Sequence, residues 1–93
     1  MTETEPFEPT TYFGVWSKAK LDAVVAMLRS LGVRFYHVHD RYTEDLLRQW
    51  CAWDPSAADP YIGYDLWIHT DDLGIVDTRI VDLFPERKFR ANP

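Results

Sequence analysis

The sequence is poor in the residues that mark several common protein classes. It contains one cysteine, Cys51, so no disulfide can form within the chain, and only four glycines, too few for a glycine-rich phosphate-binding loop. A single thiol fits a reducing compartment. No stretch approaches the roughly 18 apolar residues of a membrane span, and residues 1–9 lack the apolar run of a signal peptide. We therefore expect a cytoplasmic protein without a membrane segment.

Basic residues are also few. Ten Lys and Arg stand against fifteen Asp and Glu, which gives a net charge of −5. Nonspecific binding to nucleic acid relies on Lys and Arg to neutralise phosphates, so the charge argues against a nucleic-acid partner. The sequence also lacks a dinucleotide fingerprint, a Ser-centred nucleophile motif and a zinc-finger cysteine pattern. No such motif predicts an enzyme.

Aromatic residues are abundant instead. The 93 residues include four Trp, five Tyr and five Phe. Each aromatic side chain can bury roughly 150–250 Å², and so many of them exceed what the core of one small domain holds. We expect some of them to lie on a surface that contacts a partner or a ligand.

Hydrophobic spacing and turn signals give the order of the elements. Residues 11–16, 33–39 and 61–69 are rich in β-branched and aromatic side chains and predict strands. A helix between a Ser17 cap and a Gly32 stop is indicated by one apolar stripe: Leu21, Val24, Val25, Leu28 and Leu31. A second helix is expected at 43–54, with Leu46, Leu47, Trp50 and Trp53 on one face. A third is expected to run from a cap at Asp71 or Asp72 to Pro85.

These elements predict one α/β (α+β) domain at residues 10–85, with a flexible arm at 1–9 and a polar tail at 86–93. Their order fits a ferredoxin-like split βαβ sandwich, with a small, mainly antiparallel sheet, helices on one face and the 43–54 helix inserted. The opposite sheet face then stays open, unless the inserted helix or the loop at 54–63 covers it.

The alternation of side chains along each strand predicts which residues share that open face. In the third strand, Tyr64, Leu66 and Ile68 point one way, and the aliphatic pair should face the helices. If Val38 also faces the helices, the open face carries Phe35, His37, His39, Trp67 and His69, together with Tyr12 and Trp16. A one-residue shift in register would reverse this assignment.

Two kinds of site follow from this arrangement. His37 and His39 lie two residues apart on one strand, and His69 from the neighbouring strand could complete a three-histidine zinc site with Asp40 or Asp65 orienting a ligand. Zinc is the one cofactor that any residue pattern here suggests. Alternatively, Phe35, His37, Trp67 and His69 form an interface with a protein partner or with a second copy in a homodimer, since interfaces favour aromatic residues at their centres.

Two stretches carry a family resemblance. Residues 13–38 read strand, helix, Leu-Arg-Ser-Leu-Gly-Val and strand, and residues 64–84 read Tyr-Asp-Leu-Trp-Ile-His-Thr-Asp-Asp-Leu followed by a helix that ends in Leu-Phe-Pro. This resembles the small bacterial signal-transducing domains with a ferredoxin-like fold that are related to nitrogen-regulatory proteins. The resemblance implies neither an enzyme activity nor an established ligand. The Trp-rich segment 43–54 and the three histidines depart from that family.

The preferred hypothesis is therefore a non-enzymatic regulatory or protein-interaction module that acts through the aromatic and histidine-rich sheet face. One alternative is a metal-binding protein or small metal-dependent enzyme that uses His37, His39 and His69. The other is an acidic inhibitor or immunity-type protein, in which the carboxylates at 3–8 and 43–54 mask a basic partner.

Overall fold

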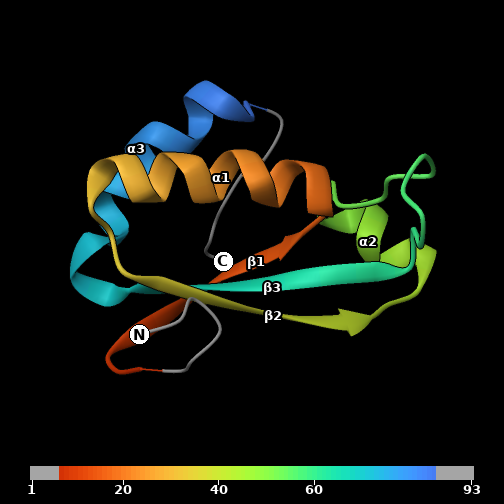
Figure 1. Ribbon diagram of the computed structural model, residues 1–93, viewed down its shortest axis with the longest axis horizontal. Coiled ribbons are helices and arrows are strands. Elements are labelled where there is room, and N and C mark those ends of the chain that lie inside the picture. Colours follow the sequence, from red (N-terminus) through yellow and green to blue (C-terminus); the bar gives the residue numbers. More distant parts are fainter. Residues whose placement is uncertain (1–6, 86–93) are drawn as a thin grey trace.

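The computed structural model describes residues 7–85. Its elements are β1 (Thr10–Trp16), α1 (Lys18–Leu31), β2 (Phe35–Arg41), α2 (Glu44–Gln49), β3 (Ile62–His69), a short 3-10 turn (Thr70–Asp72) and α3 (Leu73–Leu83). The described chain is a small α+β domain with a three-stranded antiparallel sheet and three α-helices (Figure 1). The predicted tail at 86–93 and most of the predicted arm at 1–9 lie outside the described residues.

The sheet has the order β1-β3-β2, and β3 is antiparallel to both neighbours. The two edge strands, β1 and β2, therefore run in the same direction, and α1 connects them. The signals predicted for α1 are confirmed. The Ser17 side chain accepts a hydrogen bond from the amide of Lys20, and Gly32 ends the helix with a φ of 70°. Within residues 7–85, no helix has both the length and the apolar character that crossing a membrane requires.

The main core lies between the sheet and the pair α1 and α3, which cover one face together (Figure 1). As predicted, the apolar stripe of α1 packs inward, and so do Leu66 and Ile68 of β3, both fully buried. Val76 and Ile80 of α3 complete the contact from the other helix. Burial of these aliphatic side chains fixes the phase of the central strand.

The opposite sheet face, called the open face below, is covered at one end by α2 and the residues that follow it. Leu47 of α2 is fully buried with Val15 and Ala52 in a second, smaller core. Gly63 makes room for this packing, because a Cβ there would lie only 2.7 Å from the side chains of Tyr42 and Val15.

The inserted helix is shorter than predicted and does not share a face with the other two. It ends at Gln49 rather than at residue 54, and Cys51 just beyond it has a φ of 56°. Leu46, expected on the inner face, is 42% exposed. The two tryptophans at helical spacing suggested a longer helix, but Trp50 and Trp53 instead pack around the small core from outside the helix.

Candidate functional site

The phase predicted for β2 is wrong. Phe35 lies opposite Ile68 and is buried in the main core, whereas Tyr36 lies opposite Trp67 on the open face. Val38, expected to face the helices, is on the open face and 43% exposed. The physical reason is that Phe35 and Val38 have opposite phases, and the larger apolar area of Phe35 decides which is buried. The proposed interface set is thereby split, with Trp67 and His69 on the open face and Phe35 in the core.

The three histidines do not come together. His37 and His39 lie on the helix side of the sheet, where both rings are close to Tyr64 at 6.4 and 6.0 Å between centroids. The side chain of His69 lies on the open face, like that of Trp67 and unlike that of Tyr64. Across residues 7–85, no group of three or more His, Cys, Asp and Glu side chains could hold a metal ion. The described residues 7–85 therefore do not bring His37, His39 and His69 together as the predicted zinc site requires.

His69 has a structural role that its sequence position did not suggest. The side chain is buried, and its Nδ1 accepts a hydrogen bond from the amide of Asp71 at 3.2 Å, which caps the 3-10 turn. Asp72 stands at the start of α3 but forms no capping hydrogen bond through its side chain. The His69 ring also stacks on Phe7 with 6.1 Å between centroids.

The open face carries a continuous row of aromatic rings, called the aromatic row below. Phe7 contacts Tyr36 at 5.6 Å between centroids, and Tyr36 stacks on Trp67 at 5.8 Å with only 4° between the ring planes. Trp67 then contacts Tyr12 at 4.8 Å, and Tyr12 contacts Trp50 at 6.1 Å. The row crosses β2, β3 and β1 and ends at the residue that closes α2.

A bulge in β1 decides which aromatic residues join the row. The pairing of β1 with β3 shifts between Tyr12 and Val15, and Gly14 there has a φ of 93°. Tyr12 consequently lies opposite Trp67, but Trp16 is turned into the main core and is fully buried. The expectation that Tyr12 and Trp16 share the open face is wrong for this reason.

A buried carboxylate adjoins the aromatic row. Asp65 is 9% exposed and accepts hydrogen bonds from the hydroxyls of Tyr12, at 2.6 Å, and Tyr42, at 2.7 Å to both carboxylate oxygens. Burial raises the pKa of Tyr42 to about 12, and the hydrogen bond to Asp65 adds to the rise because both favour the neutral phenol. The cluster ties β1 and the segment after β2 to the central strand.

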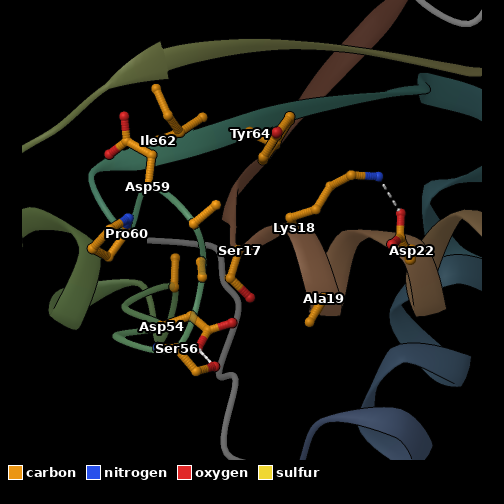
Figure 2. A pocket seen from close by; sticks show the side chains of 13 residues that line it. Ser17, Lys18, Ala19, Asp22, Asp54, Ser56, Asp59, Pro60, Ile62 and Tyr64 are labelled. Atoms are coloured by element: carbon orange, nitrogen blue, oxygen red, sulfur yellow. Dashed lines mark hydrogen bonds and ion pairs between the residues drawn. The ribbon is translucent and has the colours of Figure 1, made fainter.

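The chain also contains a cavity of about 490 Å³ between the start of α1, the loop before β3 and the first half of β3. Its charged groups already have partners: Lys18 contacts Asp22 at 2.7 Å, and Asp54 accepts from the Ser56 hydroxyl at 2.6 Å (Figure 2). Asp59 pairs with Arg41 at 2.8 Å. The lining holds neither His nor Cys, so we regard the aromatic row as the stronger candidate site.

Sequence reasoning singled out Trp67 correctly as a residue of the open face, but it missed Tyr36 and Trp50. The strict alternation of β2 would have found Tyr36 once Phe35 was assigned to the core. It also missed the cluster of Asp65 and the two tyrosines, whose members are 23 and 53 residues apart in the chain. Nothing in the local sequence signals such a contact.

Comparisons with known protein families, with curated proteins and with solved structures find no match to this chain.

Proposed function

We propose that this protein is a non-enzymatic interaction module of a regulatory kind, which associates with itself through the aromatic row. The supporting observation is the row itself: five rings in mutual contact on a sheet face that α1 and α3 leave uncovered. Tyr12 within it is 39% exposed. Tyr and Trp are enriched at the centres of protein interfaces because they bury a large area with few rotatable bonds.

The contacts within the row favour binding for an energetic reason. A side chain that is already held by its neighbours loses little conformational entropy when a partner covers it. Trp67 is held on both sides, by the Tyr36 ring and by the Tyr12 ring, and the Tyr12 hydroxyl is fixed in turn by Asp65. The row is thus a rigid apolar platform rather than a set of independent side chains.

Trp67→Ala is the variant that tests this proposal, because Trp67 is the middle ring of the row. The mass of the wild type, measured by size-exclusion chromatography with light scattering, should rise with concentration. Trp67→Ala should weaken association by about 30-fold or more, the effect of losing a central interface residue. The matched control is Tyr61→Ala, since Tyr61 is 41% exposed but lies outside the row, and it should associate like the wild type.

Two results would contradict the proposal. One is a Trp67→Ala protein that keeps its circular dichroism spectrum and associates as strongly as the wild type. The other is association that weakens steeply with salt, since exposed charges are screened within about 10 Å at 0.1 M salt. That second result would favour the acidic-inhibitor hypothesis, in which exposed carboxylates such as Asp45 contact a basic partner.

The order of the elements supports the finer, ferredoxin-like description of the domain that we propose. The described elements follow β-α-β-β-α once α2 is set aside as an insertion, and β3 lies between β1 and β2. A ferredoxin-like split βαβ domain begins with the same order and adds a fourth strand, which the described residues do not contain. The shared order supports the proposed resemblance to small bacterial signal-transducing domains. A cytoplasmic location stays a prediction from the single Cys51, and cell fractionation would test it.

A further inference from the structure

The strand β2 lies at one edge of the sheet, and within residues 7–85 its only strand neighbour is β3. The carbonyl of Arg34 accepts a hydrogen bond from the His69 amide at 3.0 Å, and the Tyr42 amide donates to the Tyr61 carbonyl at 2.8 Å. Even-numbered positions therefore direct their backbone groups toward β3. Because backbone groups alternate along a strand, the odd-numbered residues, among them Phe35 and His39, direct theirs away from the sheet. The amide of Arg41 donates to the carboxylate of Asp40 at 2.8 Å, a contact that the pairing of Arg41 would replace.

The other edge of the sheet is built differently. β1 contains the bulge at Gly14, and a bulge twists an edge strand, which disfavours pairing with a further strand. By contrast, β2 pairs with β3 in one unbroken register over all seven residues and contains no proline. Of the two edges, β2 is the one that can accept another strand.

The second half of β2, from Val38 to Arg41, is exposed, whereas Phe7 packs against Tyr36 in the first half. A hollow of about 290 Å³ lies beside the strand, lined by His37, Val38, His39 and Tyr64. On the open face, Val38 presents an apolar side chain that is 43% exposed in the middle of the strand.

We infer that β2 pairs antiparallel with β2 of a second copy of this chain, around a twofold axis at Val38. This register keeps all seven residues paired and brings together the odd-numbered positions whose backbone groups point outward. It sets Val38 against Val38 of the copy, Tyr36 against Asp40, His37 against His39 and Phe35 against Arg41. The result is a continuous sheet of six strands with isologous contacts.

The charges of the strand fit this arrangement. Arg34 precedes β2 and Asp40 lies near its end, both with side chains on the open face. In the antiparallel pair, Arg34 of each chain becomes the diagonal neighbour of Asp40 of the other, within reach of a long side chain. The two contacts are equivalent by symmetry. At the axis, Val38 meets its own copy, which gives an apolar contact without a charge.

This pairing goes beyond association through the aromatic row. The two surfaces share Tyr36, and Arg34 lies over the ring of Phe7 at 5.3 Å, but Trp67 belongs to the row alone and Val38 to the edge alone. Both aromatic rows remain on the same face of the extended sheet, so the two kinds of contact are compatible. A variant in the row, such as Trp67→Ala, should leave the edge pairing intact. A variant at Val38 should likewise leave contacts through the row intact.

Disulfide trapping tests the pairing directly. In the inferred dimer, the two Val38 residues face each other without exchanging backbone hydrogen bonds. The Cα atoms of such a pair lie about 4.5 Å apart, within the range of a disulfide. With dissolved oxygen as the oxidant, Val38→Cys in a Cys51→Ser background should therefore form a covalent dimer much faster than Val81→Cys in the same background. Val81 is 50% exposed and lies on α3, away from β2, so a cysteine there measures how fast disulfides form by random collision. Equal rates for the two variants would overturn the inference, whereas fast trapping that persists with Trp67→Ala would support it independently of the row.

Exchange of the two charges provides a second test that keeps Val38 unchanged. Arg34→Glu alone should weaken association measured by light scattering about five-fold, because two symmetry-related pairs of about 0.5 kcal/mol each are lost. Arg34→Glu combined with Asp40→Arg should restore it, since the opposite charges again lie across the axis. A double variant that associates no better than Arg34→Glu would refute this register.

Discussion

The carboxylate of Asp65 is almost completely buried, and two tyrosine hydroxyls donate hydrogen bonds to it. Removing one donor leaves part of a buried charge without a partner, which costs more than the hydrogen bond itself contributes. Tyr42 contacts both carboxylate oxygens and is partly buried, whereas Tyr12 is 39% exposed, so water can replace its hydroxyl. The two phenols should therefore differ in their contributions to stability.

We expect Tyr42→Phe to lower the free energy of unfolding by about 2 kcal/mol, in the range for hydrogen bonds to charged groups. Tyr12→Phe should cost about 1 kcal/mol or less, because water can take the place of its hydroxyl. A domain of this size has roughly 5–14 kcal/mol of stability in total. Urea unfolding followed by tryptophan fluorescence and circular dichroism would show the Tyr42→Phe loss as a midpoint shift of about 1–2 M.

The control for these variants is Tyr61→Phe, the same change at an exposed ring, which should stay within about 0.5 kcal/mol of the wild type. A second comparison isolates the buried charge. Tyr42→Phe with Asp65→Leu removes donor and acceptor together, and it should be more stable than Tyr42→Phe alone. Equal, small effects of Tyr42→Phe and Tyr61→Phe would refute the view that the phenols stabilise a desolvated carboxylate.

Three further predictions concern the same end of the sheet. Gly63→Ala should cost about 1–3 kcal/mol in chemical unfolding, because its Cβ would overlap Tyr42, Val15 and Leu47, whereas Gly74→Ala, with open space around it, should not destabilise. Leu47→Ala should cost about 2–5 kcal/mol and loosen α2, measurable by amide hydrogen exchange, because Leu47 is the fully buried centre of the small core. The pKa of Tyr42 is about 12 in the folded protein and about 10 in the unfolded chain, so the neutral phenol stabilises the fold fully below about pH 10. This stabilisation is lost as the pH rises toward 12. In urea titrations, Tyr42→Phe should therefore lose less stability than the wild type between these two pH values.

The elements that sequence reasoning predicted well are those with local signals. The α1 helix has a Ser17 cap, an apolar stripe and a Gly32 stop, all within 16 residues of sequence, and each is found as expected. The phase of β3 was also predictable, because Leu66 and Ile68 both favour the same face. Where several residues of one element support the same assignment, the pattern determines the structure.

The failures have a different origin. In β2, Phe35 and Val38 favour opposite phases, so no periodic pattern could decide between them, and the metal-site hypothesis depended on that choice. The bulge at Gly14 reverses the direction of Trp16 relative to Tyr12, and it depends on pairing with β3 rather than on β1 alone. Contacts between distant segments, and not local preference, settled each of these positions.

An acidic residue in the central strand of a sheet is costly, and its position explains how the open face is organised. Asp65 lies between the small core under α2 and the exposed aromatic row, and Tyr12 belongs to both the Asp65 cluster and the row. A leucine at residue 65 could pack against the small core, but it would leave the hydroxyls of Tyr12 and Tyr42 without their acceptor. Asp65→Leu should therefore change the orientation of Tyr12 and weaken association through the row, in addition to any effect on stability through Tyr42. Association unchanged in Asp65→Leu would show that the carboxylate has no part in ordering the row.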